Sequence, residues 1–159
     1  MFVDLDAENL ILAVEVGLAC AAAQVGLTLL FARSPSIWGE QAIFVAHQIV
    51  ALPLMLYVTV IGCAAWFSAR PEGTVESRIF GHDPAGAHLS VVLVGALVLW
   101  DIPMTFHRSI YSAASMGHHV GLAVLAVLCL LPFLQFYAPF FVGVTEISSV
   151  PLQVQARWM

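Results

Sequence analysis

The stretch that decides the fold is AIFVAHQIVALPLMLYVTVIGCAAWF, which runs from Ala42 to Phe67 and contains no Asp, Glu, Lys or Arg. About 20 mostly apolar residues in a helix cross the hydrocarbon core of a bilayer. The stretch exceeds that length, so it predicts a membrane-spanning helix. The whole chain agrees, because 61% of its residues are hydrophobic and only 9% are charged, whereas a soluble domain carries about 25% charged residues.

Four more apolar runs qualify as candidate spans on either side of this one. They extend over roughly residues 10–31, 89–106, 118–134 and 137–154. Pro, Gly and charged residues mark the stretch between Ser68 and His88 as a loop. The predicted fold class is all-α, a polytopic transmembrane helix bundle of about five spans in a single domain over residues 1–159. We expect the first run to be a retained helix, since the acidic start MFVDLDAEN lacks the basic region of a signal peptide.

Alternating spans place the connections on two sides of the membrane. We call the N-terminal side A and the opposite side B. Three arginines fall on side B and two on side A, which by the positive-inside rule does not decide the orientation. The acidic N-terminus on side A favours side B as the cytoplasmic side.

Several ionisable side chains fall inside the predicted spans, where they are costly and usually face the interior of a bundle. At 1.5 Å of rise per helical residue, His47, Asp101 and the adjacent pair His118 and His119 all lie in the side-B half of the membrane. We therefore predict a polar intramembrane site. Its expected catalytic residues are His118, His119 and Asp101, and its expected substrate-binding residues are His47, Glu146 and Ser148.

The chemistry expected of this site is that of a carboxylate–imidazole dyad. Consecutive helix residues point about 100° apart, so one histidine of the pair faces a cavity, and the other contacts a neighbouring helix or orients the first. Asp101 would fix the imidazole tautomer, as the carboxylate of a catalytic triad does. The imidazole would then act as a general base.

Other polar residues favour structural interpretations. Packing between helices is the preferred interpretation for Glu15 and Gln24, and also for His47 when it is considered alone. The three cysteines sit in apolar stretches and are expected to be small buried hydrophobes. The histidines expected to be solvated, in or beside loops, are His82, His88 and His107.

The histidine spacing does not favour a metal centre. The dense boxes of membrane di-iron enzymes, such as His-x-x-His-His, are not matched, because Ser115 stands where the upstream histidine of the pair would be. A haem held by His47 and one histidine of the pair has no further support. We predict no metal and no other resident cofactor.

At this point four segments carry a family likeness. They are AHQIVALPLMLYV around His47, VLWDIPMTFHRS around Asp101, MGHHVGLAVLAVL with the histidine pair, and GVTEISSVPLQVQARWM around Glu146. In this order they resemble the TLC-domain family, which includes the ceramide synthases and smaller TLC-domain-containing membrane proteins. The likeness covers about residues 41–159, and leaves residues 10–31 as an extra N-terminal helix.

The resemblance implies lipid chemistry, with two departures. Ceramide synthases carry paired aspartates after the histidine-pair helix and transfer an acyl group from acyl-CoA to a sphingoid base. Here the corresponding TEISSV holds the single acid Glu146, which puts ceramide synthesis in doubt. The segment is more similar to small TLC-domain proteins that handle membrane lipids. TLC domains also continue beyond this segment, so the resemblance implies that the last helix or helices are missing.

The sequence thus predicts an integral, multi-pass membrane protein that binds, senses or modifies membrane lipids, in an endomembrane such as the endoplasmic reticulum. If it is an enzyme, we expect an acyltransferase-like activity with acyl-CoA as co-substrate. The alternative is a non-catalytic structural or assembly subunit, with a membrane-protein partner packed on the open side of the bundle. Nucleic acid is not an expected partner, because the net charge is −5 and no basic run occurs.

Overall fold

The computed structural model describes residues 6–34, 41–68 and 74–148, and these ranges contain helices and connections but no strand. Three segments are long and apolar enough to cross a membrane: α1 (Ala7–Ala32), α3 (Ala42–Phe67) and the stretch Arg78–Thr105. The prediction of an all-α membrane protein is therefore confirmed at this level. The second span begins and ends at the predicted residues, and the first is a few residues longer than predicted.

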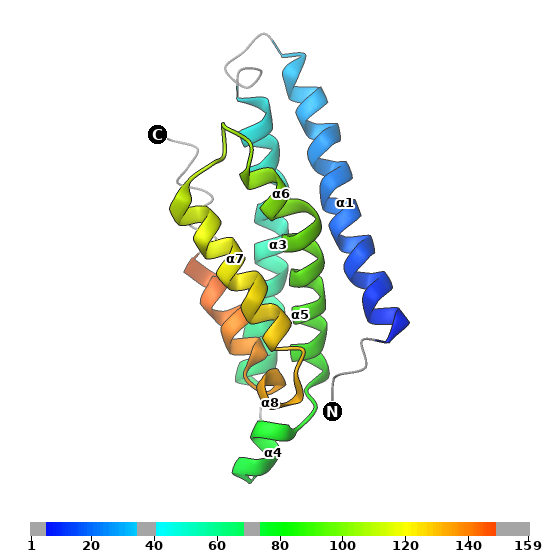
Figure 1. The fold of residues 1–159 in the computed structure, drawn as a ribbon, viewed down its shortest axis with the longest axis vertical. Coiled ribbons are helices and arrows are strands. Elements are labelled where there is room, and N and C mark those ends of the chain that lie inside the picture. The colour runs from blue at the N-terminus through cyan, green and yellow to red at the C-terminus, as the bar shows by residue number, and fades with distance from the viewer. Residues whose placement is uncertain (1–5, 35–40, 69–73, 149–159) are drawn as a thin grey trace.

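The rest of the described chain consists of shorter helical elements. In chain order they are α4 (Val75–Phe80), α5 (Pro84–Ala96), the π-helix η1 (Leu97–Asp101), α6 (Ile102–Thr105), α7 (Ala113–Leu128), α8 (Pro132–Gln135), the π-helix η2 (Pro139–Gly143) and the 3-10 helix η3 (Val144–Ser148). Figure 1 shows α3, α5 and α7 alternating in direction. The short α4 and α8 lie at the end of the bundle opposite the one where α1 ends and α3 begins.

The fourth and fifth predicted spans differ from the structure. Helix α7 begins before the histidine pair and ends at Leu128, rather than continuing to Leu134. The chain then turns, and α8 adds a single turn of helix. In the segment predicted as the fifth span, from about Tyr137, the described part consists of the π and 3-10 turns of η2 and η3. Its end, residues 149–154, lies outside the described residues.

Side-chain caps explain where α1, α5 and α7 begin, whereas Gln41 before α3 forms no side-chain cap. A residue with an oxygen-bearing side chain precedes each of these three helices and accepts a hydrogen bond from a backbone N–H in the first turn, which would otherwise lack a partner. The caps and the residues whose N–H groups they bind are Asp6 with Asn9, Asp83 with Gly86 and Ser112 with Ser115, at 2.8, 3.0 and 3.3 Å.

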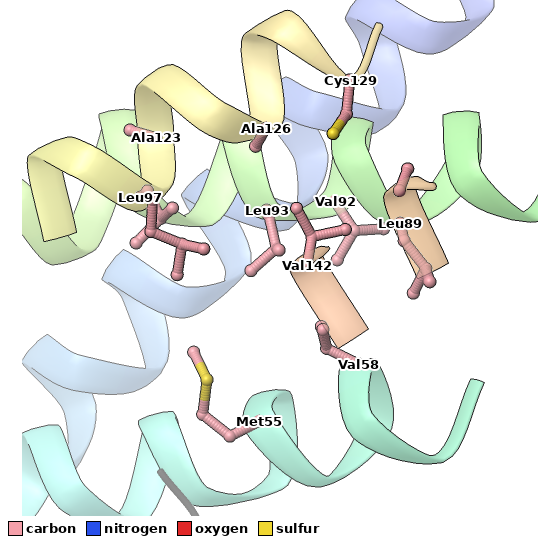
Figure 2. Close-up of a cluster of buried hydrophobic side chains, with 12 residues drawn as sticks. Met55, Val58, Leu89, Val92, Leu93, Leu97, Ala123, Ala126, Cys129 and Val142 are labelled. Carbon is pink, nitrogen blue, oxygen red and sulfur yellow. The ribbon is translucent and has the colours of Figure 1, made fainter. Parts of the chain in front are cut away.

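The core lies where α3, α5, α7 and η2 meet. Figure 2 shows apolar side chains from these four elements converging, with Leu93 of α5 and Val142 of η2 near the centre. In a bilayer the surrounding lipid is as apolar as this core, so close van der Waals packing stabilises the helix contacts more than removal of surface from water.

Two glycine crossings bring helices unusually close. A Cβ atom added to Gly62 of α3 would lie 2.5 Å from the Cα of Gly143 in η2. A Cβ atom added to Gly95 of α5 would lie 2.0 Å from the backbone oxygen of Ala13 in α1. Small residues are enriched at membrane helix contacts because they permit this approach. These crossings hold α1 against α5 and η2 against α3.

Helix α1 packs on α3 and α5 by one side and exposes the other. Gln24 is buried, and its Nε2 donates a 3.0 Å hydrogen bond to the backbone oxygen of Ile43 in α3, as expected of a residue that joins two helices. The same prediction for Glu15 is wrong, because Glu15 lies on the exposed side of α1. Most of the other exposed residues of α1 are apolar, and they include Leu18 and Leu29.

The π-turn η1 is the local feature that positions the polar site. An ordinary α-helix carries the chain from Pro84 to Ala96, and the wider turn then shifts the register of the residues that follow. Trp100 and Asp101 both end up buried, at 2% and 3% exposure. The carboxylate therefore points into the bundle rather than toward lipid.

Candidate functional site

Asp101 is the centre of a buried polar cluster formed by three helical segments. Its Oδ1 accepts a 2.8 Å hydrogen bond from Nε2 of His47 on α3. Its Oδ2 accepts a hydrogen bond from Nδ1 of His119 on α7. His47 is buried to 3% exposure, and the His119 side chain retains 17%. One carboxylate thus ties together two imidazoles whose residues lie far apart in the sequence.

These contacts determine the proton positions on both rings. A carboxylate accepts hydrogen bonds only, so His47 donates through Nε2–H and His119 donates through Nδ1–H. The remaining nitrogen of a neutral His119, Nε2, is then an acceptor. It lies 3.0 Å from the Oγ atom of Ser115, one turn earlier on the same helix. The structure therefore contains a continuous chain from the Ser115 hydroxyl through His119 to Asp101.

An aromatic contact holds the second histidine. The His47 ring stacks on Trp100, with centroids 5.1 Å apart and planes inclined by 26°. His47 Nδ1 and Trp100 Nε1 are buried and form no hydrogen bond within the described part of the chain. Stacking and a single hydrogen bond to Asp101 therefore set the orientation of His47. This arrangement suits a residue that holds the Asp101 carboxylate in position.

His118 is exposed and lines a groove of about 320 Å³ between α7 and the η2–η3 segment. The groove is lined mainly by apolar atoms and glycines. Gly117 and Gly121 leave it open, because a Cβ atom added at either position would meet nothing within 4 Å. The other lining residues are Leu122, Leu125, Phe141, Thr145 and Glu146.

The groove and the buried cluster adjoin each other. The rings of His118 and His119 make an edge contact, with centroids 5.6 Å apart. Glu146 lines the groove, is buried to 3% exposure and interacts electrostatically with His119. A molecule in the groove therefore contacts His118 and Glu146 directly and lies one side chain away from the Asp101 cluster.

The structure brings together most, but not all, of the residues predicted for the site. His47, Asp101 and His119 form the cluster, and His118 and Glu146 line the adjoining groove. Ser148 ends η3, and its side chain lies outside the described set. The prediction that the two histidines of the pair face different surroundings agrees with this arrangement, which assigns His119 to the carboxylate and His118 to the groove.

Two residues of the cluster had no role in the sequence prediction. Ser115 was considered only as the position where a metal-binding histidine is missing, and Trp100 was not singled out. The sequence could have indicated Ser115 because it precedes His119 by four residues, and residues four apart on a helix lie side by side. Trp100 gave no such signal, because its stacking on His47 depends on how α3 meets η1.

The remaining histidines take part in local contacts on the other parts of the molecule. His82 Nδ1 lies 2.8 Å from Oε1 of the buried Gln135 on α8. His88 was expected to be solvated, in or beside a loop; it lies near the start of α5, is half-buried, and its Nε2 lies 2.8 Å from the Tyr57 hydroxyl. Within residues 6–34, 41–68 and 74–148, no three His, Cys, Asp or Glu side chains are arranged to hold a metal ion.

Comparison with known proteins assigns no family or function to the chain. The chain matches no family model, no curated protein and no solved structure. The features of this protein that bear on function are therefore the cluster, the groove and the membrane-spanning helices.

Proposed function

We propose that this protein is a TLC-like integral membrane protein that binds a membrane lipid in the groove between α7 and η2–η3 and modifies it at the adjoining cluster. The observation that carries the proposal is an apolar groove lined by His118, whose ring contacts that of His119. His119 in turn bonds the buried Asp101 carboxylate, which also accepts from His47. Ionisable groups at this depth are expensive to maintain, and they commonly mark functional sites in membrane proteins.

The groove suits one acyl chain with a polar end. Leu122, Leu125 and Phe141 provide an apolar surface for the chain. His118, Thr145 and Glu146 supply imidazole, hydroxyl and carboxylate groups, which hydrogen-bond a hydroxyl, amine or carbonyl of a lipid. Its volume of about 320 Å³ is at the lower end of the range of small-molecule sites.

The TLC likeness supports the same assignment through motif order. The segments around His47, Asp101, the histidine pair and Glu146 are those on which the likeness depends, and their side chains form the cluster and the groove lining. The proposal includes five spans, with α7 and the segment after Tyr137 as the last two, and an endomembrane location such as the endoplasmic reticulum.

Photo-crosslinking tests the lipid site. Cells expressing the full chain would be given a fatty acid with a diazirine and an alkyne, which they incorporate into their lipids, and crosslinked protein would be quantified after irradiation. Gly121→Leu fills the groove, so we expect crosslinking to fall several-fold. Gly26→Leu is the matched control, because Gly26 also has open space around it but lies on α1, away from the groove.

The location of the crosslinks is the second readout. We expect them on peptides containing residues 117–125 and 141–146. Equal yields for wild type and Gly121→Leu, or crosslinks distributed evenly over all lipid-facing helices, would contradict the proposed site. A stoichiometric protein partner in native mass measurements, without bound lipid, would instead support the assembly-subunit alternative.

A further inference from the structure

We infer that Ser115 is a nucleophile and that Ser115, His119 and Asp101 form a serine acyl-transfer triad at the side-B end of α7. The inference deepens the proposed lipid function, on which it rests, by naming the reacting atom and the class of substrate. That substrate is an activated acyl group, an oxygen ester or a thioester, carried by a long-chain lipid.

The atoms are connected as the chemistry requires. Ser115 Oγ lies 3.0 Å from His119 Nε2, and the opposite ring nitrogen, Nδ1, donates to Asp101 Oδ2. In a serine triad the hydroxyl faces one imidazole nitrogen while a buried carboxylate holds the other. Here the carboxylate is 3% exposed, whereas Ser115 is half-buried and can be approached.

A second serine–histidine pair in the same chain lacks the features that favour Ser115 as a nucleophile. Ser109 Oγ lies 2.7 Å from His107 Nδ1, in the connection between α6 and α7. Both residues are exposed, and no carboxylate contact is found for His107 among the described residues. Of these two serines, Ser115 is the one that combines a histidine partner with a buried carboxylate, a half-buried position and a neighbouring apolar groove.

The reaction proceeds in two balanced steps. Ser115 Oγ attacks the acyl carbonyl carbon as its proton passes to His119 Nε2, and the bond from that carbon to the donor oxygen or sulfur breaks. The leaving group takes the proton from Nε2, which leaves an acyl ester on Ser115. A lipid hydroxyl, an amine or water then attacks the ester and loses its proton to Nε2, and Ser115 regains a proton as its ester bond breaks.

The position of Ser115 suits such a substrate. It is the third residue of α7, within about 5 Å of the helix start at 1.5 Å per residue. His118 and Leu122, which line the groove, are three and seven residues further along the same helix, so they lie on nearly the same side as Ser115. An acyl chain in the groove therefore places its carbonyl end near the Ser115 hydroxyl at the membrane surface.

An alkyl fluorophosphonate with an alkyne tag tests the nucleophile directly, because it phosphonylates an activated serine with loss of fluoride. The full-length protein in detergent would be labelled and its peptides analysed by mass spectrometry. We expect the adduct on Ser115 and not on Ser109. Ser115→Ala should abolish labelling, and Ser109→Ala should not change it. His119→Ala should lower the labelling rate by about 10²-fold or more, the usual contribution of a general base.

Two tagged acyl donors identify the source of the acyl group. The protein would be incubated separately with an alkyne-tagged fatty acyl-CoA and with an alkyne-tagged phosphatidylcholine in vesicles. An acyl ester on Ser115 from the first identifies a thioester donor, and one from the second an ester donor. Either result supports the triad.

The proposal is overturned if the folded wild-type protein gives no adduct on Ser115 with the fluorophosphonate or either donor, or if His119→Ala labels as fast as wild type. Circular dichroism melting of each variant establishes that it is folded. The labelling of Ser115 and the crosslinking of lipid in the groove can succeed or fail independently. Groove crosslinking without a Ser115 adduct removes the triad and leaves lipid binding, whereas a Ser115 adduct without groove crosslinking removes the groove and leaves the reactive serine.

Discussion

Replacing Asp101 measures how much the polar cluster contributes to folding. Asp101→Ala removes the acceptor of two hydrogen bonds, from His47 and His119. The His47 ring is 3% exposed, so its abandoned N–H remains unsatisfied, at a cost of about 1–3 kcal/mol. The His119 side chain is 17% exposed and regains water, so only the net value of its hydrogen bond, about 1 kcal/mol, is lost. We expect Asp101→Ala to lower the free energy of unfolding by about 2–4 kcal/mol.

The isosteric Asp101→Asn should be milder, with a loss of about 1–2 kcal/mol. The amide keeps one carbonyl acceptor and turns the other oxygen into a donor. His47 accommodates that donor by moving its proton to Nδ1, an atom without a hydrogen bond to any described residue. Its Nε2 then accepts from the amide. Comparing the free energies of unfolding of the two variants therefore tests the assigned tautomers as well as the contacts.

Reversible unfolding in mixed detergent micelles, followed by circular dichroism, provides the measurement. Glu15→Gln is the control, because it neutralises a carboxylate on the exposed side of α1. We expect it to change stability by less than about 0.5 kcal/mol. An Asp101→Ala protein as stable as Glu15→Gln would refute the energetic role of the cluster. An Asp101→Asn protein as unstable as Asp101→Ala would refute the tautomer argument.

Three further substitutions test a close helix crossing and the polar link between α8 and the start of α5. Gly62→Ala places a Cβ atom 2.5 Å from the Cα of Gly143, so we expect a loss of about 1–3 kcal/mol in the same assay. Gly26→Ala, which meets nothing within 4 Å, should instead be neutral or stabilising by up to about 1 kcal/mol; equal effects would contradict the close crossing. Gln135→Ala removes the acceptor of the His82 ring and should speed amide hydrogen exchange at Asp83, whose N–H also donates to Gln135; unchanged exchange would show that this link does not order the connection.

The sequence by itself determined the class of fold and the main spans. Its apolar runs exceed the thickness of a bilayer, and a helix satisfies its own backbone hydrogen bonds there. This is why Ala42–Phe67 was predicted to the residue. Counting residues along helices also predicted that Asp101 and the histidine pair lie near one another, and Asp101 does contact His119. Glu15 was misassigned because hydrophobic runs without a polar side do not reveal which side of a helix faces its neighbours.

The tertiary structure decided which of these groups meet. Hydropathy reveals neither the shift in register at the π-turn η1 nor where α7 ends at Leu128. The structure turns Asp101 inward, where its Oδ2 contacts His119 rather than His118. The same arrangement places Ser115 next to a histidine that is bonded to a buried carboxylate, which its position in the sequence did not indicate. Sequence sets how deep a residue lies in a membrane helix, whereas the rotation and crossing of the helices set what it touches.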